Sequence, residues 1–319
     1  MEPCGGSERC QPDIVLIGHI VKEMIHFPDR TIGPVLGSPV AYGSVAAGRL
    51  GERVGIVTII GEDMPDGLLQ PFRDAQVDMR GVSVRPGDRT TTTKLIYAAS
   101  GEKEIQYPQK APPISFDDIP PDYHTASVFY IATMDHDVPV GTIRDLAALD
   151  GTLAIDLGGY GGAHSRQHPN AEERRDPTEL RELVSLCDIV RASVEDCGHL
   201  LGAESVATPA GEEKVVNQFV DWGASIGLLT LGERGCVLAT AEGVERVPAQ
   251  SGEVIDTTGA GDSFSTVFLS GYRRSGDARW AARLGAAAVI HVIERSGGVH
   301  KTRMPTRDEV EKRMLVASP

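Results

Sequence analysis

The segment from Asp256 to Asp262 reads Asp-Thr-Thr-Gly-Ala-Gly-Asp and runs directly into an amphipathic stretch, 261–274. Gly259, Ala260 and Gly261 have no bulky side chains, so the backbone there can approach a ligand closely. Unpaired N–H groups at the start of a helix point towards such a ligand and favour an anion. We therefore predict a phosphate-binding turn at Gly259, Ala260 and Gly261.

Asp262 follows this turn and lies in the first helical turn of the predicted helix. Its carboxylate would lie beside a bound phosphoryl group, within reach of a hydroxyl that attacks it. A base in this position makes the alcohol a better nucleophile, while the amides stabilise charge on the phosphoryl oxygens. The alternative is a glycine-rich turn that simply begins a helix, with Asp262 complementing the helix dipole. For an isolated G-x-G pair that alternative is the better one.

The elements that must position this turn alternate along the chain. Short apolar runs typical of buried strands occur at 14–18, 54–60, 128–132, 153–157, 188–190 and 227–231. Helix-like segments lie between them, at 40–50, 67–75, 138–149 and 212–222, and the last third is helical at 261–274, 278–293 and 306–315. The alternation predicts an α/β fold, a doubly wound and mostly parallel sheet with helices on both faces.

Three stretches depart from the alternation. Residues 90–98 and 104–107 look like two strands joined by a turn, and we predict a small β-sheet lid formed mainly by about 18–36 and 88–110. A long irregular segment at 158–177 is expected to border the substrate. Residues 1–12 are expected to be a flexible tail before a single domain over 13–319.

Composition limits the classes of function. The 319 residues carry a formal net charge of -14, which repels nucleic acid and anionic membrane, so a phosphate ligand needs a local site. The five cysteines are odd in number and form no C-x-x-C pair, which argues against a disulfide framework or zinc site. With no signal peptide or membrane span apparent, we expect a cytoplasmic protein with a small-molecule ligand.

The string D-T-x-G-A-G-D resembles the signature of the ribokinase, or PfkB, carbohydrate kinase family. The strand alternation, the early β lid and the helical end fall where that fold has them. The resemblance implies a ribokinase-like fold and an ATP-dependent kinase. It also implies that Asp262 is the catalytic base and that Gly259, Ala260 and Gly261 form the anion hole. The resemblance therefore favours a catalytic role for this turn over a glycine-rich turn that simply begins a helix.

The resemblance further implies a set of cofactor residues for ATP, Mg²⁺ and, as an additional expectation, K⁺. Asp256 and Thr258 stand where many family members bind a monovalent cation, and Ser193 and Asp196 stand at the N-x-x-E motif that organises water-bound magnesium, with Glu195 in reserve. Residues expected near the nucleotide are Thr230, Gly232, Gly235, Gly285 and Gly297.

The second family motif is altered. It normally opens with two glycines and carries an Asn that holds a sugar hydroxyl, whereas here Gly37 is followed by Ser38, and Tyr42 stands at the Asn position. Pro39 restricts Ser38 to extended geometry, which would damp lid closure. Glu23 replaces the family's early substrate Asp. We expect substrate contacts from Glu23, Gly37, Ser38 and Tyr42.

Polar residues also follow the predicted strands. Asp135 and His136 come after the strand at 128–132, and Asp156 lies at the end of the strand at 153–157. Ligands of open α/β sheets bind at the carboxyl ends of strands, so these side chains are predicted to hold substrate hydroxyls. A capped loop before the next helix explains Asp135 and His136 equally well.

The predicted substrate is a sugar or cyclitol, with an inositol-like compound favoured because the stretch 37–42 resembles the inositol-kinase-like branch. A nucleoside kinase is the alternative, since Tyr42 could stack on a base. A non-catalytic ligand-binding protein on the same fold is the competing class. An NAD-binding oxidoreductase is excluded, because Gly18-His19-Ile20 gives no G-x-G-x-x-G. The lid is also expected to form a homodimer contact.

Overall fold

The computed structural model describes residues 11–97, 103–166 and 177–316. Most of the predicted tail, the turn at 100–101 and part of the segment at 158–177 lie outside the described residues. A nine-stranded sheet forms the centre, in the order β13-β12-β11-β10-β9-β8-β1-β4-β5. Its strands are β1 (Ile14–Ile17), β4 (Val54–Gly61), β5 (Asp78–Arg85), β8 (Val128–Ile131), β9 (Thr152–Asp156), β10 (Ile189–Ser193), β11 (Ile226–Thr230), β12 (Cys236–Thr240) and β13 (Gly243–Val247).

The strands pair in parallel from β5 across to β11, whereas β12 and β13 are antiparallel. The predicted mostly parallel sheet is therefore confirmed. From β1 the chain proceeds to β4 and β5 on one side and later to β8 and β9 on the other. This reversal marks the topological switch point, where ligands of open α/β sheets bind beyond the carboxyl ends of strands.

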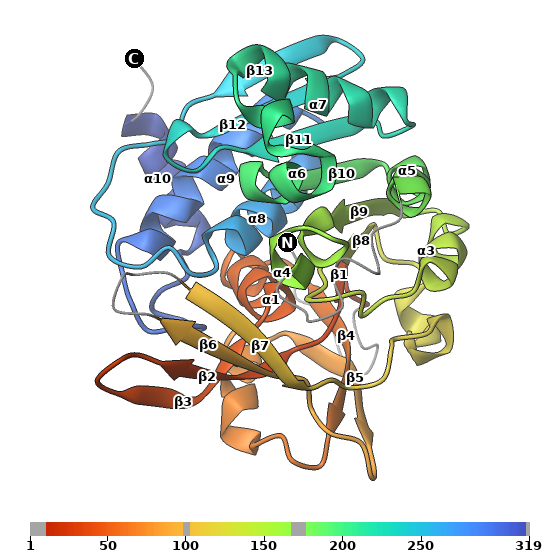
Figure 1. The fold of residues 1–319 in the computed structure, drawn as a ribbon, viewed down its shortest axis with the longest axis vertical. Coiled ribbons are helices and arrows are strands. Elements are labelled where there is room, and N and C mark those ends of the chain that lie inside the picture. Colours follow the sequence, from red (N-terminus) through yellow and green to blue (C-terminus); the bar gives the residue numbers. More distant parts are fainter. Residues whose placement is uncertain (1–10, 98–102, 167–176, 317–319) are drawn as a thin grey trace, which may run out of the picture.

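Helices cover both faces of the sheet (Figure 1). Ile14 and Leu16 of β1 point into one apolar cluster and Val15 and Ile17 into the other, because successive side chains on a strand alternate. The first cluster is covered by α1 (Pro39–Arg49), α8 (Ala260–Ser275), α9 (Ala278–Ile293) and α10 (Arg307–Val316). The second is covered by α3 (Val140–Ala147), α5 (Pro177–Leu186), α6 (Val194–Leu201) and α7 (Pro209–Asp221). Two short helices, α2 (Gln70–Asp74) and α4 (Ala163–Arg166), complete the set.

A separate four-stranded sheet lies at the lower left of Figure 1. Its strands are β2 (Val21–His26), β3 (Thr31–Gly37), β6 (Thr92–Tyr97) and β7 (Lys103–Gln109), in the order β3-β2-β6-β7. We call it the lid sheet. The strands come from 21–37 and 92–109, within or next to the two segments assigned to a lid from the sequence. None of the helices described above has both the length and the apolar character needed to cross a membrane.

Candidate active site

The turn at Gly259 has the backbone that anion binding needs. Gly259 is the residue before α8 and has φ 75°, a left-handed conformation that favours glycine. The N–H of Ala260 donates to the carbonyl oxygen of Thr257. Among the described residues, no hydrogen bond uses the N–H groups of Gly261 and Asp262. The start of α8 thus offers two backbone donors and the positive end of a helix dipole to an anion.

Asp262 lies beside these donors in the first turn of α8. Burial raises the pKa of its carboxyl to about 6, and the carboxylates of Asp156 and Asp196 contribute to the rise, while His164 and Arg191 oppose it. A general base works best with a pKa close to the working pH. At neutral pH Asp262 is mostly ionised and is a stronger base than an ordinary aspartate.

Arg191 is a site residue that the sequence did not reveal. It lies on β10, is largely buried, and its Nη2 lies 2.7 Å from where a Cβ on Gly261 would stand. Its Nη1 donates to Asp156 Oδ2 at 2.6 Å and its Nη2 to Thr230 Oγ1 at 2.6 Å. Its buried Nε has no partner in the described part of the chain. A guanidinium next to the anion hole is suited to contact phosphate oxygens.

Asp156 and Asp196 have structural partners within this cluster. Asp156, predicted to bind substrate, instead neutralises Arg191 and accepts from the N–H of Gly158 at 2.9 Å. Asp196 accepts from Ser193 N and Oγ, both at 2.7 Å, and from Ala163 N at 2.8 Å. Ser193 and Asp196 form the capping box of α6. With both oxygens engaged, Asp196 is suited at most to a water-mediated contact with magnesium.

The predicted nucleotide residues divide into two groups. Thr230 contacts Arg191, and Gly232 and Gly235 take positive φ around a turn after β11. The side-chain position of Gly232 is open, whereas that of Gly235 lies against the backbone at Val247. Gly297 has φ 118° and open space where a side chain would stand. Gly285, however, lies at the contact of α9 with α8, where a Cβ would meet the Phe264 ring at 3.0 Å. It allows two helices to pack closely, and its place beside an adenine pocket stays a prediction.

Tyr42 packs against the turn at Gly259. It is 4% exposed, and its ring packs so closely on Gly259 that a Cβ there would overlap it. Nine consecutive residues of α1, from Pro39 to Ala47, are buried. This packing does not support the prediction that Tyr42 reads a sugar hydroxyl or a base, and the ring instead supports the turn at Gly259.

Glu23 on β2 and Gly37 at the end of β3 lie close together in the lid sheet. Glu23 Oε2 accepts from Thr93 Oγ1 at 3.3 Å and lies 3.3 Å from where a Cβ on Gly37 would stand. Ser38 caps α1, since its Oγ accepts from the N–H of Ala41 at 3.2 Å, and it has φ 115°. Ser38 is thus engaged in capping, whereas Glu23 and Gly37 stay candidates for substrate contact.

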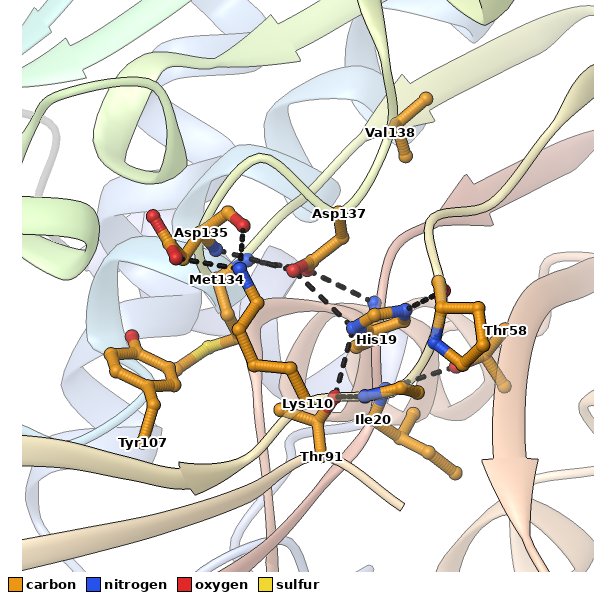
Figure 2. A network of polar contacts seen from close by, with 12 residues as sticks. His19, Ile20, Thr58, Thr91, Tyr107, Lys110, Met134, Asp135, Asp137 and Val138 are labelled. Carbon is orange, nitrogen blue, oxygen red and sulfur yellow. Dashed lines mark hydrogen bonds and ion pairs between the residues drawn. The ribbon is translucent and has the colours of Figure 1, made fainter. Parts of the chain in front are cut away.

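A buried polar network joins the lid sheet to the large sheet (Figure 2). The His19 ring, just after β1, contacts Asp137 Oδ1 at 3.3 Å and Thr91 Oγ1 at 2.9 Å. Lys110, just after β7, donates to Asp135 Oδ2 at 2.6 Å. Segments that enter and leave the lid sheet are therefore fixed to the loop after β8.

Asp135 and His136, which were predicted to hold substrate hydroxyls, both have partners within the protein. Asp135 is fully buried and pairs with Lys110. His136 has φ 50°, contacts Glu179 of α5 at 3.5 Å and packs edge-on against the Tyr160 ring. His136 thus contacts the α5 side of the fold, and its predicted role in holding substrate is not supported.

Asp256 and Thr258, the expected potassium ligands, have other partners. Asp256 Oδ1 accepts from the N–H of Thr258 at 2.9 Å, and Asp256 Oδ2 lies 3.3 Å from Nη2 of the buried Arg303. Both oxygens of this carboxylate are engaged. The arrangement does not fit a metal ion at Asp256.

Comparison with known proteins agrees with this geometry. The family model described as "pfkB family carbohydrate kinase" matches residues 43–306. The chain is 30% identical over 296 residues to the cytidine kinase of Thermococcus kodakarensis, covering 89% of this chain and 97% of that one. Fructokinase of Xylella fastidiosa with bound ATP superposes with a TM-score of 0.80 at 22% identity, over 97% of this chain and 100% of that chain. Arabidopsis thaliana ribokinase complexed with ribose and ATP gives 0.79 at 18% identity, over 96% and 99%.

The mostly parallel sheet with helices on both faces and a separate small sheet is the ribokinase fold of these neighbours. The chain belongs to the pfkB family of carbohydrate kinases and is a kinase.

Proposed function

We propose that this kinase transfers the γ-phosphoryl group of MgATP to a hydroxyl of a nucleoside. The observation that carries the phosphoryl transfer is the pair of unused N–H groups at Gly261 and Asp262 next to a carboxyl whose pKa is about 6. Mg²⁺ enters as part of the nucleotide substrate, since it keeps several waters and binds mainly through phosphate oxygens. Asp196 is proposed to contact one of those waters.

In this mechanism Asp262 accepts the proton of the attacking hydroxyl as its oxygen bonds to the γ-phosphorus, and the bond from that phosphorus to the bridging oxygen breaks to release ADP. The N–H groups of Gly261 and Asp262 stabilise charge on the phosphoryl oxygens, and Arg191 adds a fixed positive charge beside them. Asp156 holds the Arg191 guanidinium through Nη1, and this contact directs Nη2 towards the backbone of Gly261. The residues thereby combine a base with a preorganised site for the transferred group.

The adenine of ATP has a candidate position in a cavity of about 960 Å³, which lies between the segment 247–251 and α9. At about 1.5 Å per residue, the stretch of α9 from Ala286, which lines the cavity, to Ile293 is about 10 Å long. The N–H groups of Ile255 and Asp256 donate to the carbonyl oxygen of Ile293, so the far end of this stretch meets the anion-hole segment. The cavity walls carry five cationic side chains, Arg246, Arg279, Arg283, Lys312 and Arg313.

The proposed acceptor follows the cytidine kinase relative, which shares 30% identity over nearly its whole length. The preference for a cyclitol came from the stretch 37–42, in which Ser38 caps α1 and Tyr42 is buried against Gly259. Glu23 supports a ribose, because a carboxylate accepts hydrogen bonds from two vicinal hydroxyls. We propose that Glu23 binds the 2′- and 3′-hydroxyls.

The test is an ATP-consumption assay over cytidine, uridine, adenosine, ribose, fructose and myo-inositol. A nucleoside is expected to give the highest kcat/KM, by at least about tenfold. Fastest turnover of a free sugar or of myo-inositol would refute the nucleoside assignment and leave the kinase assignment intact. If a nucleoside is the acceptor, Glu23→Gln should raise KM for the ribonucleoside more than it raises KM for the 2′,3′-dideoxy analogue.

A further inference from the structure

A buried arginine lies directly behind the anion-hole segment. Arg303, between α9 and α10, is 1% exposed. Its Nε donates to the carbonyl oxygens of Val292 at 2.9 Å and Arg295 at 2.8 Å. Its Nη1 donates to Gly298 O at 3.4 Å and its Nη2 to Asp256 O at 2.8 Å. The guanidinium therefore gathers four backbone carbonyls and the Asp256 carboxylate around one positive charge.

Converging carbonyl and carboxylate oxygens are the ligands that a monovalent metal ion takes, and rings of backbone carbonyls bind K⁺ in this way. A guanidinium has five N–H donors and an invariant charge, so it satisfies the same acceptors. Here the guanidinium occupies the centre of the set. A metal ion added beside it would meet like-charge repulsion and oxygens that already accept hydrogen bonds.

The same guanidinium is linked to the catalytic turn. Asp256, which it holds through both backbone and side chain, accepts from the N–H of Thr258. The Arg303 Cζ lies 5.8 Å from the centre of the Tyr42 ring, and that ring packs on Gly259. The turn is thus held at Asp256 from one side and at Gly259 from the other.

We propose that Arg303 is a tethered cation that takes the place of a monovalent metal ion and positions the anion hole, so that this kinase works without K⁺. The proposal rests on the phosphoryl-transfer function proposed above. Arg303 is a positioning residue, because it acts on phosphate through the 256–259 segment.

The unmodified protein supplies the first test. Turnover and calorimetric ATP affinity are measured in KCl, NaCl and tetramethylammonium chloride at equal ionic strength. Values within about twofold across the three salts are expected. Activation of about tenfold or more by K⁺, in turnover or in ATP affinity, would overturn the proposal.

The second test removes the tethered charge. Arg303→Ala is expected to weaken ATP binding and to lower kcat, each by about tenfold or more, and to regain part of both in KCl or in non-denaturing guanidinium chloride. Arg303→Met keeps the aliphatic stem, which fills the space that an added cation would need. This variant should lose ATP affinity and kcat without regaining them in KCl or guanidinium chloride. Arg307→Ala is the matched control, since Arg307 also donates to a backbone carbonyl, Leu50 O at 3.0 Å, and to a carboxylate, Glu52 Oε1 at 2.6 Å, through contacts outside the turn.

The outcomes separate the two proposals. A folded Arg303→Ala variant with unchanged ATP affinity and turnover would refute the role of Arg303. If no acceptor is phosphorylated, the proposed function fails, but calorimetric ATP affinity still reports on Arg303. If Arg303→Ala does not fold, the salt series on the unmodified protein decides the question.

Discussion

Asp262→Asn should abolish most of the activity and at the same time stabilise the fold. The pKa of Asp262 is raised from 3.8 to about 6, so the folded protein binds a proton at this carboxyl more tightly than the unfolded chain does. Ionised Asp262 therefore destabilises the folded state at every pH above about 6, and the penalty disappears as pH falls towards 4. A difference of about 2 pKa units corresponds to about 3 kcal/mol at pH 8, and only a small part of that penalty is left at pH 4.

The neutral Asn removes this penalty, so the free energy of unfolding should rise by up to about 3 kcal/mol at pH 8 and hardly at all at pH 4. Turnover at saturating substrate should fall by about two to four orders of magnitude, the usual contribution of a positioned base. Thermal melts at the two pH values and coupled ATP-consumption kinetics measure both effects. Asp145→Asn, an exposed carboxylate on α3, is the control and should change neither.

The pH profile of the unmodified enzyme tests the same reasoning. With a pKa of about 6, roughly a tenth of Asp262 is ionised at pH 5, so kcat/KM should fall about tenfold between pH 8 and pH 5. An ordinary aspartate would stay mostly ionised over that range. A flat profile down to pH 5 would refute the raised pKa, and a loss of less than about tenfold in the Asn variant would refute Asp262 as the base.

Further outcomes follow from close contacts. Gly261→Val should raise KM for ATP and lower kcat, each by about tenfold or more, because its Cβ would stand 2.7 Å from Arg191 Nη2; steady-state kinetics measures this. Tyr42→Phe should leave the acceptor KM within about twofold, whereas Tyr42→Ala should lower the unfolding free energy by about 3 to 5 kcal/mol in denaturant melts. A changed acceptor KM in a stable Phe variant would return Tyr42 to the substrate site. Lys110→Met should destabilise by about 1 to 3 kcal/mol, since Asp135 loses the cation facing it; an unchanged melting temperature would contradict this.

Local patterns in the sequence were sufficient to predict the fold and the turn that begins α8. The apolar runs that became β1, β4, β8, β9 and β11 are buried on both faces and carry a clear signal without any partner being known. The turn before α8 is equally local, because small residues, a helix start and a first-turn carboxylate are adjacent in the sequence. The helix at 278–293 was predicted with the bounds that α9 has.

Contacts between distant segments were not predictable. Arg191 is one charge in a short apolar strand, and only the fold brings it to Asp156 and Gly261. Tyr42 was assigned to the substrate because it stands at the position of the family's sugar-binding Asn. Its helix, α1, is buried over most of its length and has no polar face that could show where the side chain points. Ser193 and Asp196 show a third limit, because S-x-x-D at a helix start has the same spacing as a capping box and as a metal-associated motif.

The segment from Asp256 to Asp262 does not by itself define a working site. Glycines at 259 and 261 allow the backbone to face a phosphate, yet the same freedom lets the turn take other conformations in the absence of support. Electrostatic catalysis requires the donors to be aligned before the reaction, because reorganising them during the reaction would add to the barrier. Tyr42, packed against Gly259, and Arg303, bonded to Asp256, supply that support from segments far away in the sequence. A chain that shared the string but lacked such contacts would bind phosphate less firmly, and its base would be aligned only part of the time.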